Sequence, residues 1–326
     1  MNFTQNNQYA STIPEKIVSS HIQRLSWADH ARGFAIILVA YRHVAIGMRR
    51  SGIQVNDLVY NFHELFFNFR MPVFFVLSGI FTANSLRKRT YKTVFKDKIY
   101  TLLYPYLLWG FILMGLEILF SQYTNSKHDW GDLKNIFIQP RMVDHLWYLF
   151  ALFNVSLIFL IFSQVIKNKW IHGLIAISLQ AFAFLPIFTN NSLVLDAFYF
   201  YPFYFIGTLL SATLLDESKS ASILNVGHLK WLLPAFIAGQ SFWLLHRSQE
   251  ETYFLLFFLI NLIACYLVYT VFYQVSKRGA LGWLAYMGSY SLYIYILHVP
   301  VAAILRILFI RMNLTQYPGV IFIVCW

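Results

Sequence analysis

Long apolar runs constrain this chain more than any other feature of its sequence. A helix needs about 20 apolar residues to cross roughly 30 Å of hydrocarbon. Only 12% of the residues are charged and 58% are hydrophobic, which is typical of a protein whose surface faces lipid. We therefore expect an all-α, polytopic transmembrane helical bundle embedded in a lipid bilayer. Spans are predicted near residues 31–50, 60–84, 99–121, 146–166, 170–188, 194–214, 230–246, 253–275 and 284–310.

The two ends of the chain depart from this pattern. Residues 1–30 are predicted to form a polar tail, and residues 31–326 a single transmembrane domain. A tenth apolar run begins at Tyr317 but stops at Trp326, too early to cross a bilayer. The expectation is about ten spans, with the last one truncated.

The basic residues predict an orientation. The net charge is +11, but the cations are concentrated between apolar runs, which favours membrane topology over nucleic acid binding. By the positive-inside rule, the loop after the second span should be cytoplasmic, and the N-terminus with it. That loop contains Arg87, Lys88, Arg89, Lys92, Lys96 and Lys98.

The first span carries two basic side chains that are costly to bury. Arg32 and His43 are separated by about three helical turns, so they lie roughly 20° apart on one face and roughly 16 Å apart along the axis. An ionisable group at mid-membrane costs at least about 2.5–3.5 kcal/mol and points to function. The alternative is an arginine whose charge reaches the surface, plus a core histidine bonded to a carbonyl oxygen.

Three later segments carry comparable residues. Arg70 lies within the second span just before Pro72. It suits an anion, and the alternatives are the carbonyl oxygens that proline frees or an ion pair with Glu64. His145 and Trp147 begin the fourth span, where aromatic residues often only mark the interface. His298 lies deep in the ninth span and has the alternative of bonding to a neighbouring helix.

Together these segments resemble the acyltransferase 3 family of membrane acyltransferases, over roughly residues 24–310. The most specific element is the Arg32–ten residues–His43 spacing, with Asp29 and Gly33 around the arginine. The stretches that supply the rest of the resemblance are Phe69-Arg70-Met71-Pro72 to Ser78-Gly79, His145-Leu146-Trp147-Tyr148-Leu149, and Ser291-Leu292-Tyr293 to His298.

The resemblance implies transfer of an acyl group, commonly acetyl from acetyl-CoA, to a hydroxyl of a cell-surface glycan or lipid-linked sugar, without a metal. It also implies a bacterial inner membrane location. Such relatives often carry two arginines three residues apart in the loop after the second span. Here Arg89 and Lys92 are the nearest equivalent, and lysine lacks the bidentate fork of arginine.

This chemistry assigns provisional roles. His43 is the candidate base, with Arg32 and Arg70 as the other catalytic candidates. Substrate positioning falls to His145, Trp147 and His298. Arg32, Arg87, Lys88, Arg89 and Lys92 are candidates for holding the phosphates of acyl-CoA.

Two other functions use the same residues. Buried cations also suit a transporter or flippase for an anionic solute or glycan. A structural subunit of polysaccharide export is the third alternative. The acceptor, the choice of acetyl or succinyl and the oligomeric state are not specified by these patterns.

Overall fold

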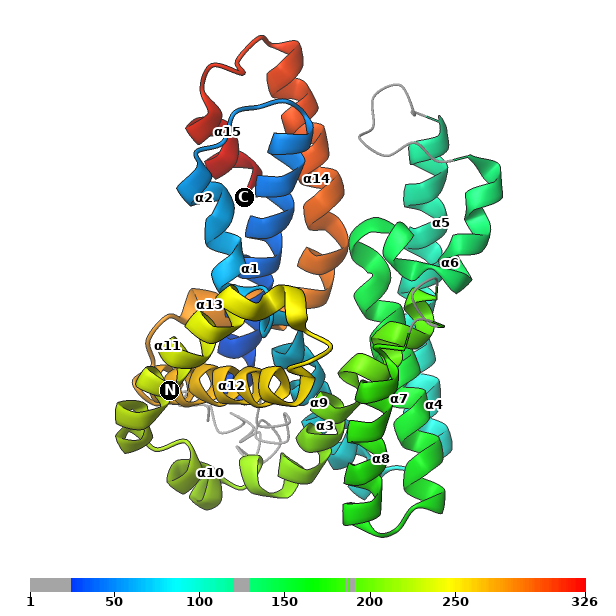
Figure 1. Ribbon diagram of the computed structural model, residues 1–326. Helices are drawn as coiled ribbons and strands as arrows, with labels where there is room; N and C mark the ends of the chain where they lie inside the picture. The colour runs from blue at the N-terminus through cyan, green and yellow to red at the C-terminus, as the bar shows by residue number, and fades with distance from the viewer. Residues whose placement is uncertain (1–24, 120–128, 186, 188–190) are drawn as a thin grey trace, which may run out of the picture.

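The structure is a computed structural model that describes residues 25–119, 129–185, 187 and 191–326. Its regular elements in these residues are all helical, so the predicted all-α polytopic bundle is confirmed (Figure 1). The first helix, α1 (Ser26–Arg50), begins within the predicted tail. Residues 1–24 of that tail lie outside the described part of the chain.

Eight helical stretches in the described residues are long and apolar enough to cross a membrane. The expected number was about ten. Residues 170–188 form α8 (Lys169–Phe182), whose 14 residues span only about 21 Å. The eight stretches are Ser26–Arg50, Asp57–Lys88, Tyr91–Leu119, Trp147–Val165, Ser192–Leu214, Glu217–Gln249, Phe254–Lys277 and Ser291–Arg311.

Several predicted spans are interrupted. The second contains α2 (Asp57–Asn61), a 3-10 turn (Phe62–Phe66) and α3 (Arg70–Lys88). The ninth is divided at Tyr290 into α13 (Gly282–Ser289) and α14 (Ser291–Arg311). The terminal apolar run forms only α15 (Pro318–Cys325), as its length predicts.

The remaining helices complete the bundle. A π-helical turn, Ile99–Leu103, joins α4 (Tyr91–Lys98) to α5 (Tyr104–Leu119). Such turns often mark functional sites. The helices that follow are α6 (Asn135–Ile138), α7 (Trp147–Val165), α9 (Ser192–Leu214), α10 (Glu217–Ile223), α11 (Leu229–His246) and α12 (Phe254–Lys277).

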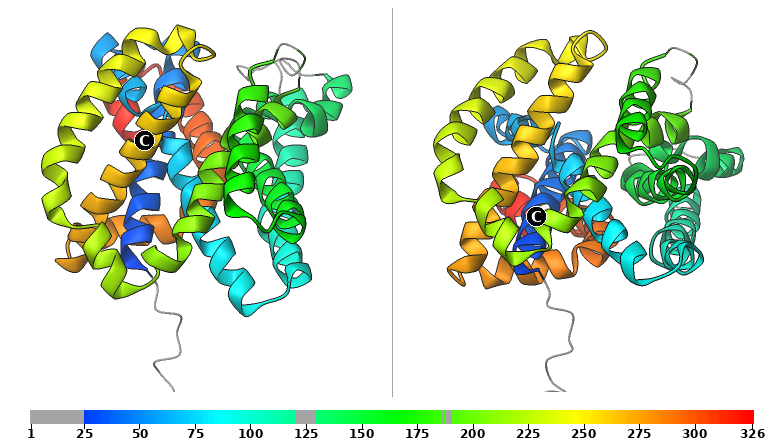
Figure 2. Two further views of the ribbon diagram at one scale, coloured as in Figure 1. Left: turned by 60° about the horizontal axis from the view of Figure 1, so that its bottom comes forward. Right: turned by 90° about the horizontal axis from the view of Figure 1, so that it is seen from below.

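Two groups of helices flank a central pair. Figure 1 shows α1, α14 and α15 in one group and α4, α5, α7 and α8 in the other, and Figure 2 shows these groups from two further directions. The central pair is α3 and α9, which pack closely against each other. Their interface includes the Phe75 and Phe200 rings, stacked with centroids 4.3 Å apart.

Glycines allow the tightest helix contacts. A Cβ added to Gly79 of α3 would overlap the Tyr204 carbonyl oxygen of α9, and one added to Gly207 would overlap the Val76 carbonyl oxygen. Gly33 and Gly288 play the same part between α1 and α13. Small residues let helices approach closely in membranes. Gly33 and Gly79, which lie in the family-like motifs, therefore have a packing role.

The bundle has two chemically different ends. At one, which we call the basic end, α1 begins and the exposed cations Arg87, Lys88, Arg89 and Lys92 join α3 to α4. Lys98 is near enough to Arg32 for their charges to repel, which ties this loop to the start of α1. The other, which we call the opposite end, holds the end of α1, residues 129–146 and residues 247–253.

Candidate active site

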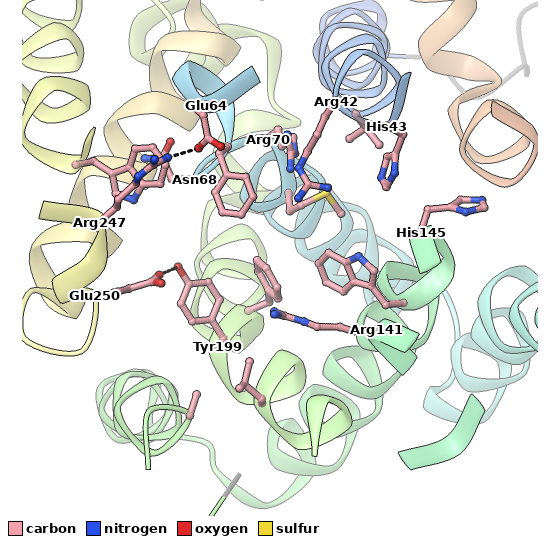
Figure 3. Close-up of a pocket in the computed structure, with 18 of the residues that line it drawn as sticks. Arg42, His43, Glu64, Asn68, Arg70, Arg141, His145, Tyr199, Arg247 and Glu250 are labelled. Carbon is pink, nitrogen blue, oxygen red and sulfur yellow. Dashed lines mark hydrogen bonds and ion pairs between the residues drawn. The ribbon is translucent and has the colours of Figure 1, made fainter. Parts of the chain in front are cut away.

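A cavity of about 780 Å³ lies among the helix ends at the opposite end of the bundle (Figure 3). Its size is within the range of small-molecule sites, about 300–1,000 Å³. Five arginines line it together with His43, His145, Glu64 and Glu250, and aromatic rings form much of the remaining wall. The arginines are Arg42, Arg50, Arg70, Arg141 and Arg247.

Three histidines from distant parts of the chain meet beside this cavity. The ring centroid of His43 on α1 is 6.0 Å from that of His145 and 5.1 Å from that of His298 on α14. The His145 and His298 centroids are 5.0 Å apart. His43 and His145 line the cavity, and His298 contacts both rings. The fold thus assembles three residues predicted separately from sequence.

Backbone carbonyls orient two of these rings. His298 Nδ1 lies 2.8 Å from the Tyr295 carbonyl oxygen, and His145 Nε2 lies 3.1 Å from the Ile296 carbonyl oxygen. Because a carbonyl oxygen only accepts, each of these nitrogens donates. The neutral rings are therefore basic at His298 Nε2 and His145 Nδ1. The Tyr295 hydroxyl donates to the His145 carbonyl oxygen and holds this segment against α14.

An ion pair holds the wall segment that precedes His145. Arg141 donates from Nε to both carboxylate oxygens of Asp196, at 3.0 and 3.1 Å, and from Nη2 to Oδ1 at 2.5 Å. Asp196 is fully buried on α9. The same guanidinium lies over the Trp147 ring, 5.3 Å from its centroid. This contact places Trp147 in the cavity wall.

Two further arginines share one aromatic ring. The guanidinium carbons of Arg42 and Arg70 lie 5.4 and 5.0 Å from the centroid of Phe67. Figure 3 shows the two side chains next to each other at the cavity. Arg70 is 6% exposed, and its Nη1 has no hydrogen-bond partner among the described residues. Proximity of two such charges is unfavourable without a compensating anion.

The carboxylates of the cavity bind other side chains directly, although Glu64 is near enough to Arg70 for their charges to attract. Glu64, considered from sequence as a partner for Arg70, forms its ion pair with Arg247. Glu250 accepts a hydrogen bond from the Tyr199 hydroxyl at 2.8 Å. Burial raises the pKa of the Glu250 carboxyl, although the Tyr199 hydrogen bond and the charge of Arg141 oppose the shift.

Arg32 does not line this cavity. It forms an ion pair with Asp29 at 3.1 Å and lies over the Phe81 ring, 4.6 Å from the centroid. It thus belongs to the basic end, as do the four loop cations, where Arg89 pairs with Asp97 at 2.7 Å. The structure brings His43, Arg70, His145, Trp147 and His298 together and leaves the predicted phosphate-binding residues at the other end.

Several cavity residues were missed by sequence reasoning. Arg141, Arg247 and Glu250 lie near span boundaries, where polar residues are ordinary, and Tyr199 lies within α9, where a tyrosine is not distinctive. Asp196 did carry a usable signal, because it is a carboxylate inside an apolar run. The described residues contain no group of three or more histidine, cysteine, aspartate or glutamate side chains arranged to hold a metal ion.

Comparison with known proteins shows to which family the chain belongs. A family model described as an acyltransferase domain, that of acyltransferase 3, matches residues 25–326. The chain belongs to the acyltransferase 3 family. Family membership and the eight candidate spans indicate an integral membrane protein.

Curated relatives include two nodulation proteins NolL. That of Sinorhizobium fredii is 24% identical over 197 residues, covering 59% of this chain and 50% of the relative. That of Mesorhizobium japonicum is 22% identical over 229 residues, covering 69% of this chain and 57% of the relative. The chain thus spans only about half of the curated relatives it matches. No solved structure matches it.

Proposed function

We propose that this protein is a membrane O-acyltransferase. It transfers an acyl group, with acetyl as the expected one, from acyl-CoA to a hydroxyl of a cell-surface glycan or lipid-linked sugar. The observation that carries the proposal is the convergence of His43, His145 and His298 beside an arginine-lined cavity. Acyl transfer to an alcohol requires a base with a pKa near neutrality and positive charge near the carbonyl oxygen.

In the proposed reaction, His43 removes the proton from the acceptor hydroxyl. The hydroxyl oxygen attacks the thioester carbon and forms the new ester bond, and the C–S bond then breaks. The CoA thiolate leaves and takes the proton back from His43. Arg70 stabilises the negative charge that develops on the carbonyl oxygen. His145, Trp147 and His298 position the acceptor.

The donor enters from the basic end in this proposal. Arg32, Arg87, Lys88, Arg89 and Lys92 supply cations for the CoA phosphates, as the family resemblance suggests. The arginine and histidine of α1 are about 16 Å apart along the helix, which is consistent with phosphates held at one end and a thioester carried inward on the pantetheine arm.

The proposed setting is a bacterial inner membrane with the N-terminus and the basic end in the cytoplasm. The concentration of cations in the α3–α4 loop supports this orientation. The cavity then faces the other side of the membrane, where cell-surface glycans are found. No metal takes part in the proposed reaction.

The decisive experiment follows both products of transfer. Purified protein in detergent is incubated with carbon-14 acetyl-CoA and membrane glycans, and free CoA and labelled glycan are measured together. Equal amounts of both are expected. Movement of glycan across reconstituted vesicles, with neither CoA release nor label incorporation, would replace this proposal with the flippase alternative.

A further inference from the structure

The cavity carries more positive charge than its own carboxylates balance. Its five arginines face Glu64, Glu250 and the Asp196 carboxylate bound to Arg141, which leaves an excess of two positive charges with neutral histidines. Glu64 already forms an ion pair with Arg247, and Asp196 with Arg141. Arg70 is the buried member of this set, so an added anion would be most strongly stabilised beside it.

The Arg42–Arg70 pair has the geometry of an anion site. Both guanidinium groups lie over the Phe67 ring at the cavity wall. Arg70 is more than nine-tenths buried, and its Nη1 lacks a hydrogen-bond partner among the described residues. A buried cation with an unsatisfied N–H is costly, and a bound oxyacid would satisfy it. A guanidinium has five N–H groups, so Arg70 can hold the acyl carbonyl and still share an oxyacid with Arg42.

We propose that the acceptor is an acidic saccharide whose carboxylate or phosphate binds between Arg42 and Arg70 while its hydroxyl meets His43. This inference rests on the proposed function and specifies its substrate class. The cavity lies at the end opposite the basic loop, so its anion belongs to the acceptor and the CoA phosphates bind elsewhere. Aromatic side chains in the same wall, including Trp147, Tyr199 and Trp243, provide flat surfaces for sugar rings.

Arg42 is the specificity-determining residue in this arrangement. Arg42 lies among the ten residues between Arg32 and His43, whose identities the family-like spacing does not specify. On α1 it neighbours His43, so it positions the anion close to the base. Its loss should weaken binding of the acidic group without removing the base or the charge near the carbonyl.

The test measures sugar binding without any acyl donor. Purified full-length protein in detergent is titrated with glucuronate, glucose 1-phosphate and neutral glucose, and saturation-transfer NMR gives the apparent Kd of each. We expect an anionic sugar to bind about tenfold or more tightly than glucose. Arg42→Gln should remove this preference, and Arg42→Lys should retain part of it. Glucose binding should stay unchanged in both variants.

The matched control is Arg49→Gln, on the same helix. Arg49 is exposed, pairs with Asp57 at 2.5 Å and does not line the cavity, so its replacement should preserve the preference. Preference for glucuronate alone assigns a carboxylate, and preference for glucose 1-phosphate alone assigns a phosphate. Equal binding of all three sugars to the unaltered protein overturns the inference, even if Arg42→Gln does not fold.

The CoA phosphates are tested as a competing source of the anion. Coenzyme A should not displace the anionic sugar, and Arg42→Gln should not weaken CoA binding. Displacement with the same dependence on Arg42 would assign the anion site to the donor and overturn the inference. These binding measurements need no turnover, so they are independent of the proposed acyl transfer. If the protein prefers anionic sugars but transfers no acyl group, the proposed function fails and the anion site remains. If it acylates neutral acceptors and shows no preference for anionic sugars, the proposed function remains and this inference fails.

Discussion

The rings of His43 and His298 lie with their centroids 5.1 Å apart, although one residue is on the first helix and the other on α14. Contact between them means that the His43 imidazole faces the protein interior and not lipid. The packing of α14 against α1 therefore decides whether the histidine of the first span can serve as a catalytic base.

Replacing His43 with alanine should abolish acyl transfer. We expect CoA release to fall by about 100-fold or more, the usual contribution of a general base. His246→Ala is the matched control, since His246 lies outside the cavity and bonds to the Phe242 carbonyl oxygen at 3.0 Å. Both variants should reach the membrane in equal amounts. Retained glycan acylation by His43→Ala would remove the catalytic assignment.

Changes at Arg70 should separate charge from packing. Arg70→Leu removes the buried cation and should lower kcat by about 100- to 1,000-fold, as for loss of an oxyanion donor. Arg70→Lys keeps the charge without the guanidinium fork and should lose less. Steady-state CoA release measures both. Indistinguishable kcat values for the two variants and the unaltered protein would leave Arg70 with a packing role alone.

The basic loop, which joins α3 to α4 at the basic end, should strengthen binding of the acyl-CoA donor. The double variant Arg89→Gln/Lys92→Gln should raise the KM for acetyl-CoA several-fold with little change in kcat, and the effect should shrink as ionic strength rises. Lys167→Gln/Lys169→Gln is the control, because both lysines are exposed but lie outside this loop. If the two double variants raise KM equally, the loop would have no specific role in binding CoA.

The ion pair behind the cavity wall should contribute to stability. Asp196→Asn leaves Arg141 without its carboxylate and should destabilise the protein by about 3 kcal/mol, the lower end for buried pairs, because half of the Arg141 side chain is exposed. Thermal unfolding in detergent gives this value. Asp216→Asn, at an exposed pair with Lys219, should change stability far less, because water screens that pair. Equal destabilisation by the two variants would contradict the structural role of Asp196.

Glu250 should make stability depend on pH. Burial raises the pKa of its carboxyl in the folded state, so folding takes up a proton between the ordinary pKa and the raised one. The stability that this protonation contributes is greatest at low pH, and it is lost as the pH rises from the ordinary pKa through the raised pKa. Glu250→Gln lacks it, and its amide oxygen can still accept from Tyr199. The melting temperature of Glu250→Gln, relative to that of the unaltered protein, should therefore increase as the pH is raised from 4.5 to 7. A constant difference would show that Glu250 is not perturbed.

The fold class was predictable because bilayer thickness imposes a local length on apolar helices. That prediction is confirmed, whereas the span count was less accurate. Whether residues 170–188 cross a bilayer depends on the cap at Asn168 and the helix end at Phe182. The division of the ninth span at Tyr290 depends on how α13 packs against α1 through Gly288. Hydropathy averages over such boundaries and cannot detect them.

The sequence by itself determined the helical bundle, the basic end and the relation between Arg32 and His43, since helical periodicity fixes neighbours on one helix. Only tertiary structure decided that these two residues serve different ends of the bundle. It also decided that His145 and His298 join His43, that Asp196 binds Arg141, and that Arg42 and Arg70 share Phe67. Such contacts depend on packing between helices far apart in sequence, and no local pattern records that packing.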